Sequence, residues 1–190
     1  MSDRDDLAGA TVAHRSAGAA QRLAALVDGV LAPAPMAPST VDVASERWHE
    51  SLQLARDRLE MSMLDWITAV DEQDVGFSVL AHLAAVDVPG GVNRLLVRTR
   101  VPRERPRLSS VVDVFPAAGW HERETAEMFG VEFTGHPGLR SLLLPDGFTG
   151  HPLRKEFELV ERARVLWPGA ADPAARPAHP GQDASPTGDP

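Results

Sequence analysis

The stretch FSVLAHLAAVDVPGGVNRLLVRTRV, residues 77–101, decides the fold of this 190-residue chain. Apolar residues alternate along both of its halves with a period of two, and the second half places arginines on the opposite face. This alternation is typical of antiparallel strands that bury one face and expose the other. The residues DVPGGVN between the halves favour a turn. The stretch therefore predicts two paired strands with one solvated face.

The flanking segments extend this pair of strands into a larger sheet. Residues 61–70, MSMLDWITAV, are nearly all apolar, as in a buried strand, and TVDV at 40–43 predicts a further brief strand. Between them, residues 45–59 carry an apolar stripe with helical spacing, and Ser45 is expected to cap the helix. The stripe consists of Trp48, Leu52, Ala55 and Leu59. The predicted fold is α+β: an antiparallel β-meander covered by helices, followed by a loop-rich C-terminal extension with a short helix.

Four regions follow from this pattern. Residues 1–39 are predicted to be a flexible N-terminal segment with a short amphipathic helix over 16–31, and residues 40–103 an α+β domain. Residues 104–167 are predicted to hold a helix and an extended docking segment. Residues 168–190 are rich in Pro, Gly, Ala and Asp and contain no aliphatic residue larger than Ala, so we expect a disordered tail.

Composition excludes several classes of function. The formal net charge of −8 argues against nucleic acid as the main partner. The chain has no cysteine, so we expect no disulfide, no thiol nucleophile and no cysteine-ligated cluster in it. It contains no G-x-G-x-x-G or Walker sequence that would cradle the phosphates of a nucleotide. It also lacks a long apolar run and a secretory signal, so we expect a cytoplasmic protein without a transmembrane helix.

The sequence GWHERETAEMFGVEF, residues 119–133, predicts a second helix. Glu122 and Glu124 are expected in its first turn, where the helix macrodipole favours carboxylates. Arg123 and Glu127 are spaced i, i+4 and are expected to pair. Gly130 is expected to end the helix in the left-handed conformation.

The pentapeptide FTGHP occurs twice, at 133–137 and 148–152. Two such units close together could be a metal-ligand pair, a substrate cradle, or two turns that shape a docking surface. His136, His151 and a carboxylate could build a metallohydrolase site, but there is no HExxH and both histidines precede proline. Gly-His-Pro favours a turn, because Gly allows unusual φ and Pro fixes the next φ.

The region HERETAEMFGVEFTGHPGLRSLLLPDGFTGHPLRKEF, 121–157, resembles the signature region of the 30 kDa-type subunit, also called the C subunit, of respiratory complex I (NADH:quinone oxidoreductase). The shared features are E-R-E, an acidic helix ending in Gly-Val, aromatic-x-G-H-P, Leu-Arg, a Leu-rich step ending in Pro-Asp, and G-H-P-L-R-K. Residues 63–72 and 95–102 also look similar, so the resemblance covers about 40–157. The chain departs from the family pattern at Ala126, Gly138, Ser141, Phe148 and Glu158.

This resemblance implies a non-catalytic structural subunit of a proton-translocating NADH:quinone oxidoreductase, docked in the peripheral quinone-reducing arm. It implies no catalytic, cofactor-binding or metal-binding residues in this chain, with iron–sulfur clusters and FMN in partner subunits. The implied partners are chiefly the homologue of the D subunit and also the B and I subunits. The implied location is peripheral, on the cytoplasmic side of the cell membrane, with membrane contact only through the complex.

The two FTGHP copies are then expected to be paired turns that shape a docking surface. The residues expected to face partners are Glu122, Arg123, Glu124, His136, Arg140, His151, Arg154 and Lys155. The three residues on the helix could instead tie its start to the loops by internal ion pairs. Two alternatives stay open: the equivalent subunit of a membrane-bound hydrogenase or deazaflavin-dependent dehydrogenase complex, and a stand-alone metallohydrolase.

Overall fold

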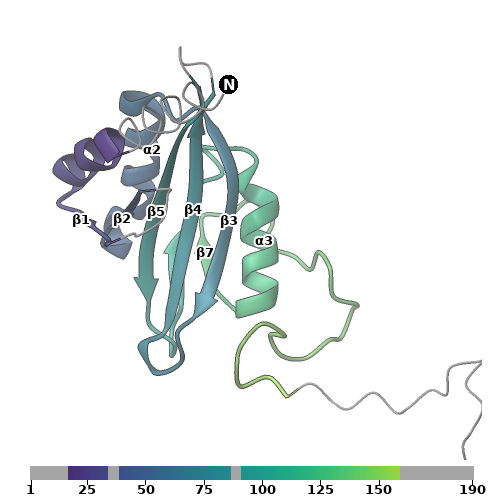
Figure 1. Cartoon of the computed structure of the whole chain (residues 1–190). Coiled ribbons are helices and arrows are strands. Elements are labelled where there is room, and N and C mark those ends of the chain that lie inside the picture. Colours follow the sequence, from purple (N-terminus) through teal and green to yellow (C-terminus); the bar gives the residue numbers. More distant parts are fainter. Residues whose placement is uncertain (1–16, 34–38, 87–90, 159–190) are drawn as a thin grey trace, which may run out of the picture. The chain divides into compact units, whose positions relative to one another are not determined.

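The structure, a computed structural model, describes residues 17–33, 39–86 and 91–158. The predicted disordered tail at 168–190 lies outside these residues, and so do the first sixteen residues of the predicted flexible segment. The described chain builds a five-stranded sheet in the order β1-β2-β5-β4-β3 (Figure 1). The α+β class predicted from the sequence is confirmed.

The antiparallel meander consists of β3 (Met63–Asp71), β4 (Phe77–Ala85) and β5 (Asn93–Val101). The three strands pair in that order, with Phe77 opposite both Asp71 and Val101. A short 3-10 helix, η2 (Gln73–Val75), connects the first two strands. The predicted pair of strands at 77–101 is therefore present at the centre of the sheet. β5 buries alternate residues as predicted, but β4 is buried on both faces, so the prediction of a solvated face is wrong for β4.

The sheet is mixed, whereas the sequence predicts an antiparallel one. β2 (Thr40–Asp42) runs parallel to β5, and β1 (Val30–Leu31) pairs antiparallel with β2. Arg98 joins β5 to β2: it donates from Nε and Nη2 to the two carboxylate oxygens of Asp42 at 2.5 and 2.7 Å. This bidentate pair holds a strand that is only three residues long.

The N-terminal helix is shorter than predicted. Residues 17–27 are helical, and Leu23 and Val27 lie buried in the core. The helix predicted over 16–31 includes Val30 and Leu31, but these residues form β1 and are exposed. The reason is a reversal at 28–29, where Asp28 adopts a positive φ of 50° and ends the helix.

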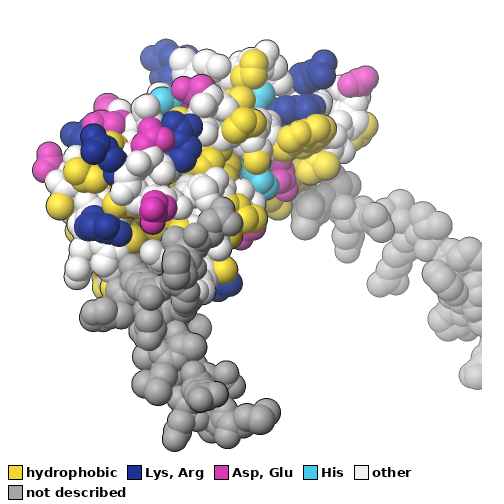
Figure 2. All heavy atoms as spheres, turned by 90° about the horizontal axis from the view of Figure 1, so that it is seen from above, with side chains coloured by type: hydrophobic (Ala, Val, Ile, Leu, Met, Phe, Trp, Pro, Cys, Tyr) yellow, Lys and Arg dark blue, Asp and Glu magenta, His cyan; other side chains and the backbone are white. Residues whose placement is uncertain are grey.

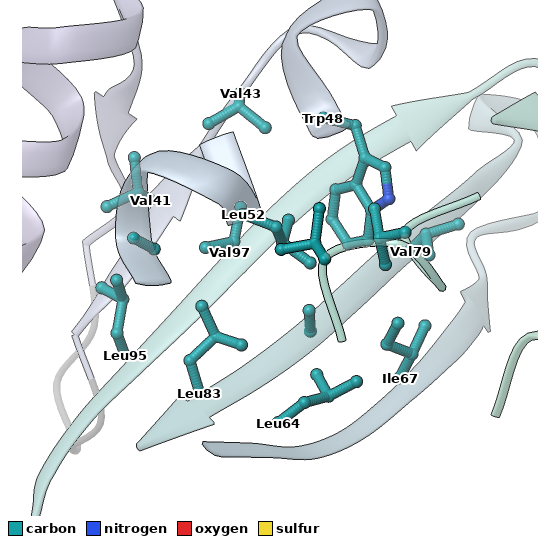
Figure 3. Close-up of a cluster of buried hydrophobic side chains, with 14 of the residues drawn as sticks. Val41, Val43, Trp48, Leu52, Leu64, Ile67, Val79, Leu83, Leu95 and Val97 are labelled. Atoms are coloured by element: carbon teal, nitrogen blue, oxygen red, sulfur yellow. The ribbon is translucent and has the colours of Figure 1, made fainter. Parts of the chain in front are cut away.

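The helix predicted over 45–59 begins differently from the prediction. Ser45–Arg47 form a 3-10 turn, η1, and the α-helix proper, α2, runs over Trp48–Leu59. No side chain caps its start, so Ser45 is not the N-cap that the sequence predicts. The apolar stripe is confirmed. Trp48 and Leu52 point from α2 onto Val79 and Val97 of the sheet (Figure 3), and all four are buried.

The second helix, α3, runs over Ala118–Phe129. It begins earlier than the sequence predicts, so its first turn contains no acidic residue. Gly130 follows it with φ 73°, which confirms the predicted left-handed end. α3 packs along β3, and Phe129 meets Phe77 edge to face with ring centroids 6.3 Å apart.

Residues on both sides of the predicted boundary at 103/104 contribute to one core. Two short strands, β6 (Arg107–Ser109) and β7 (Glu132–Thr134), pair in parallel, and the buried Leu108 and Phe133 join the same hydrophobic cluster as the meander. The described residues up to Phe157 belong to one compact unit. Within the described residues, every helix is too short or too polar to span a bilayer.

Candidate partner-docking site

The second Gly-His-Pro unit closes the C-terminal end of α3. His151 donates from Nδ1 to the carbonyl oxygen of Glu127 at 2.8 Å, and Arg154 donates from Nε to that of Phe129 at 2.7 Å. The N–H of Leu153 donates to the carbonyl of Met128 at 3.1 Å. The last carbonyls of a helix have no partner within the helix, so these donors stabilise its end.

Gly130 makes this closure sterically feasible. A Cβ atom at this position would lie 2.4 Å from Nη2 of Arg154 and 2.5 Å from Nε2 of His151. Both side chains therefore lie over the backbone where only a glycine fits. The guanidinium of Arg154 also lies 5.1 Å from the ring centroid of Phe77, which joins the motif to the sheet.

The first Gly-His-Pro unit is hydrogen-bonded to the opposite, N-terminal end of the same helix. His136 donates from Nε2 to the carbonyl of Gly119 at 3.1 Å, and its Nδ1 accepts the N–H of Gly138 at 2.9 Å. These bonds require the proton on Nε2 and a lone pair on Nδ1. The two copies are therefore turns, and their glycines, Gly135 and Gly150, have φ of 87° and 95°.

Arg123 and Glu127 hold the loop between the two copies. Arg123 donates from Nε and Nη2 to the carbonyls of Arg140 and Ser141 at 3.0 and 2.6 Å. Glu127 accepts the N–H groups at 142–144 at 2.8 to 3.1 Å. They form no direct ion pair, unlike the sequence prediction, because each is taken up by the loop. Burial raises the pKa of Glu127, but these three N–H groups outweigh it and lower the pKa overall.

Glu122 is fully buried and lies neither at a partner surface nor in an ion pair, the two roles that the sequence leaves open. Its carboxylate accepts the N–H of Val111 at 2.7 Å and the hydroxyl of Ser110 at 2.6 Å. Burial raises its pKa above the usual value, against the effect of these hydrogen bonds. Glu122 therefore holds residues 110–111, which precede α3, by hydrogen bonds in the protein interior. Glu124, two positions on, is exposed.

Asp71 is a central residue that sequence reasoning misses. It is buried at the end of β3 and accepts N–H groups from Gln73 and Lys155, both at 2.8 Å, as well as a guanidinium N–H of Arg103. Burial raises its pKa, but these donors, Lys155 and Gln73 before Arg103, outweigh burial and lower it overall. The available signal is a lone carboxylate directly after the apolar stretch 61–70.

Arg103 extends this anchor to the end of the described chain. Its Nη1 donates to both carboxylate oxygens of Glu156 at 2.9 and 2.8 Å, and its Nε donates to the carbonyl of Gln73 at 2.8 Å. Its guanidinium lies 4.8 Å from the ring centroid of Phe77. Asp71 and Arg103 thus fasten residues 150–157 to the sheet.

The exposed part of this region is more apolar than the sequence analysis suggests. Figure 2 shows hydrophobic side chains beside Lys and Arg groups on the side of the molecule where α3 lies. Large apolar side chains there are 40% to 64% exposed. They belong to Trp120, Leu139, Leu143, Phe148 and Leu153. Large apolar groups exposed in one contiguous patch are typical of interaction surfaces, so this region is a candidate for one.

The eight residues expected to face partners divide into two groups. Glu124, Arg140 and Lys155 are exposed. The other five are at least partly buried and bond to their own chain. Their contribution to partner binding stays a prediction. Among the described residues, no group of three or more His, Asp or Glu side chains is placed to hold a metal ion.

The fold and site thus describe a small α+β protein whose C-terminal extension is held against its second helix and displays apolar side chains. The family model described as "Respiratory-chain NADH dehydrogenase, 30 Kd subunit" matches residues 41–163. The chain belongs to this family, as the resemblance in the sequence indicates.

Named relatives agree with this assignment. The C subunit of NADH-quinone oxidoreductase from Ruegeria is 50% identical over 103 residues, which cover 53% of this chain and 49% of the relative. Subunit 5 from Thermus thermophilus is 41% identical over 108 residues, which cover 56% and 52%. The C/D subunit from Gluconacetobacter diazotrophicus is 41% identical over 105 residues, 50% of this chain and 17% of that protein. The chain thus spans about half the length of the separate subunits, and less of the C/D protein.

Two solved structures share the fold. The trypsin-resistant fragment (1–134) of Nqo5 matches with a TM-score of 0.57 and 26% identity, covering 66% of this chain and 99% of the fragment. A chain of the membrane-bound sulfane sulfur reductase, an archaeal respiratory membrane complex, matches with a TM-score of 0.66 and 22% identity. It covers 80% of this chain and 94% of the other. This second likeness shows the fold.

Proposed function

We propose that this chain is a non-catalytic structural subunit of a proton-translocating NADH:quinone oxidoreductase. It docks in the peripheral quinone-reducing arm, where electrons pass from NADH to quinone through iron–sulfur clusters and FMN held by other subunits. Family membership supports the complex. The observation that supports the docking role is the C-terminal extension, which is fastened to α3 by its own hydrogen bonds while Leu143 and Leu153 remain 61% and 53% exposed.

The chief partner in this proposal is the homologue of the D subunit. The Gluconacetobacter relative carries both letters, C and D, in the name of one protein, which supports a close association of the two. The B and I subunits are the further proposed partners. The assembled complex would hold this chain peripherally, on the cytoplasmic side of the cell membrane.

Fastening the extension in advance favours docking. A segment that is ordered before binding loses less conformational entropy when a partner covers it. His151 and Arg154 close the end of α3, and Asp71 holds the N–H of Lys155. The side chains that remain exposed are then available for the partner. They include Leu143, Leu153 and the cations Arg140 and Lys155.

Affinity purification of the tagged chain from detergent-solubilised membranes tests this proposal. We expect the quinone-reductase subunits, with the D homologue foremost, to co-purify together with NADH:quinone reductase activity. Replacing both Leu143 and Leu153 by Ser should lower the recovery of these subunits without changing the melting temperature of the isolated chain. Val75→Ser, at a position that is 64% exposed on η2, is the matched control.

The equivalent subunit of a membrane-bound hydrogenase or of a deazaflavin-dependent dehydrogenase complex is the second candidate. The fold shared with the archaeal respiratory complex supports a family of related assemblies but does not distinguish among them. The identity of the electron donor distinguishes the two candidates. Co-purification of an NADH-oxidising module with NADH-dependent quinone reduction supports the first candidate. Recovery of a hydrogenase or deazaflavin-binding subunit instead would overturn it.

A further inference from the structure

Two hollows lie between α3 and the loop that follows β7. One has a volume of about 310 Å³ and the other has about 420 Å³. Arg123 and Arg140 line both of them. The two hollows therefore form one groove with two lobes that meet at these arginines, and we call it the arginine groove.

Apolar side chains line part of both lobes, beside Glu127 and His151 in the smaller one. In the smaller lobe they include Ala126, Leu144, Pro145 and Phe148. In the larger lobe they include Pro116, Pro137 and Trp120, and Trp120 is 64% exposed. The guanidinium of Arg123 lies 5.2 Å from the centroid of the Trp120 ring. Apolar side chains of a partner could pack against the apolar lining of each lobe.

The charges at the junction of the lobes do not cancel. Both carboxylate oxygens of Glu127 accept hydrogen bonds from backbone N–H groups of the loop. Arg123 donates to two backbone carbonyls. The guanidinium of Arg140 is exposed and makes no hydrogen bond or ion pair with the described part of the chain. An acidic chain of net charge −8 thus presents, within its described residues, an unpaired cation that lines both hollows. A guanidinium in such a place is complementary to a carboxylate, which it can bind bidentately.

We propose that the arginine groove binds a segment of the partner subunit in which an Asp or Glu is flanked by apolar side chains. The carboxylate pairs with Arg140, and the apolar neighbours occupy the two lobes. This inference rests on the proposed docking function. It adds the chemistry of the partner segment and the residues that receive it.

Carbodiimide cross-linking of the assembled membrane complex tests the carboxylate. The variant Arg140→Lys keeps the positive charge and provides an amine, which carbodiimide joins to a carboxylate in contact with it. The natural sequence has one lysine, Lys155, so the wild type reports the background from that site. We expect a new cross-link from position 140 to an Asp or Glu of another subunit, identified by mass spectrometry. Cross-links only to carboxylates of the same chain, or none from position 140, would overturn the inference.

Substitutions test the groove independently. We expect Arg140→Glu to lower incorporation into the complex by about tenfold, and Arg140→Gln by less, because reversal adds repulsion to the loss of the pair. Ser141→Trp should block the smaller lobe and also lower incorporation. The matched controls are Arg100→Glu, on the exposed face of β5, and Ser62→Trp, between α2 and β3; both should assemble normally.

The outcomes separate this inference from the proposed function. If the wild-type chain fails to co-purify with a membrane oxidoreductase, the proposed function fails. If the wild type assembles, and Arg140→Glu and Ser141→Trp assemble equally well, the groove inference fails alone. The melting temperatures of the isolated Arg140 variants should match the wild type, because this side chain is exposed and unpaired within the described chain.

Discussion

The backbone N–H of Lys155 donates to a carboxylate oxygen of Asp71 at 2.8 Å, across 84 positions of sequence. Asp71 ends an edge strand of the sheet, and Lys155 follows the second FTGHP copy. This bond and those of Arg103 fasten the C-terminal extension to the sheet. The carboxylate is buried and accepts three donors, so it joins the extension, the η2 turn and Arg103 at the end of β3.

Asp71→Asn should therefore destabilise the isolated chain. The amide keeps the shape, but its NH₂ group faces a backbone N–H in either orientation, so one buried donor is left unsatisfied. We expect a loss of about 2 kcal/mol in the free energy of unfolding, measured by urea denaturation. Asp74→Asn, on the exposed η2 turn, is the matched control and should change it by less than about 0.5 kcal/mol. Equal stability of the two variants would contradict the anchor.

The same carboxylate predicts a pH dependence at the acid end. The pKa of Asp71 is lower in the folded chain than its usual value of 3.8. Its contribution to stability is therefore complete above that usual value and is lost as the pH falls through the folded pKa. The difference in unfolding free energy between wild type and Asp71→Asn should shrink as the pH is lowered below about 4. A difference that stays constant down to about pH 2 would contradict it.

Glu122 should behave in the opposite way. Burial raises its pKa above the usual value of 4.5, so the folded chain binds its proton more tightly than the unfolded chain does. Stability then falls as the pH rises from the unfolded pKa to the folded pKa and stays lower above it. Glu122→Gln keeps an acceptor for the N–H of Val111 and carries no charge. We expect it to gain stability relative to the wild type as the pH rises from about 4.5 toward neutrality, in a urea series at several pH values.

Much of the fold could be predicted because the strands of the meander pair with their neighbours in sequence, so the local residue pattern carries the information. Alternation at 77–101 reports strand pairing between neighbours in sequence, and the stripe on α2 reports one buried face. The parallel addition of β2 could not be predicted in this way. It depends on Asp42 meeting Arg98 from 56 positions away, and no local periodicity records such a pair.

The candidate site was harder to predict for the same reason. The turns at the two FTGHP copies follow from their Gly and Pro residues, and the positive φ of Gly135 and Gly150 agrees with them. Sequence alone cannot show which way the side chains between those residues point. The sequence predicts that His151 and Arg154 face a partner, but in the structure both side chains donate hydrogen bonds to carbonyl oxygens of α3. The hydrogen-bonding needs of a helix end 24 to 25 positions earlier decide their orientation.

This orientation changes the expected effect of two substitutions. The sequence predicts that His151→Ala and Arg154→Ala leave the melting temperature of the isolated chain nearly unchanged. The structure predicts that each removes a donor from the end of α3, at about 1 kcal/mol. For a domain of this size that is a fall of about 2–4 °C in melting temperature, measured by circular dichroism. Lys155→Ala, whose side chain is exposed, should leave it unchanged. Unchanged melting in all three would restore the partner-facing interpretation.

Gly130→Ala provides the most direct test of how the motif closes the helix. Gly130 has φ 73°, where an L-residue loses about 1 kcal/mol or more, and an added Cβ would displace both His151 and Arg154. We expect the loss of stability to exceed that of either alanine variant at 151 or 154, because strain and the loss of both donors combine. Gly138→Ala is the matched control, since a Cβ there meets no atom within 4 Å. In the triple variant that also carries His151→Ala and Arg154→Ala, the collision is absent and only the strain at Gly130 should remain as an added cost. If Gly130→Ala instead costs no more than Gly138→Ala in urea denaturation, the two side chains do not lie over the helix end in solution.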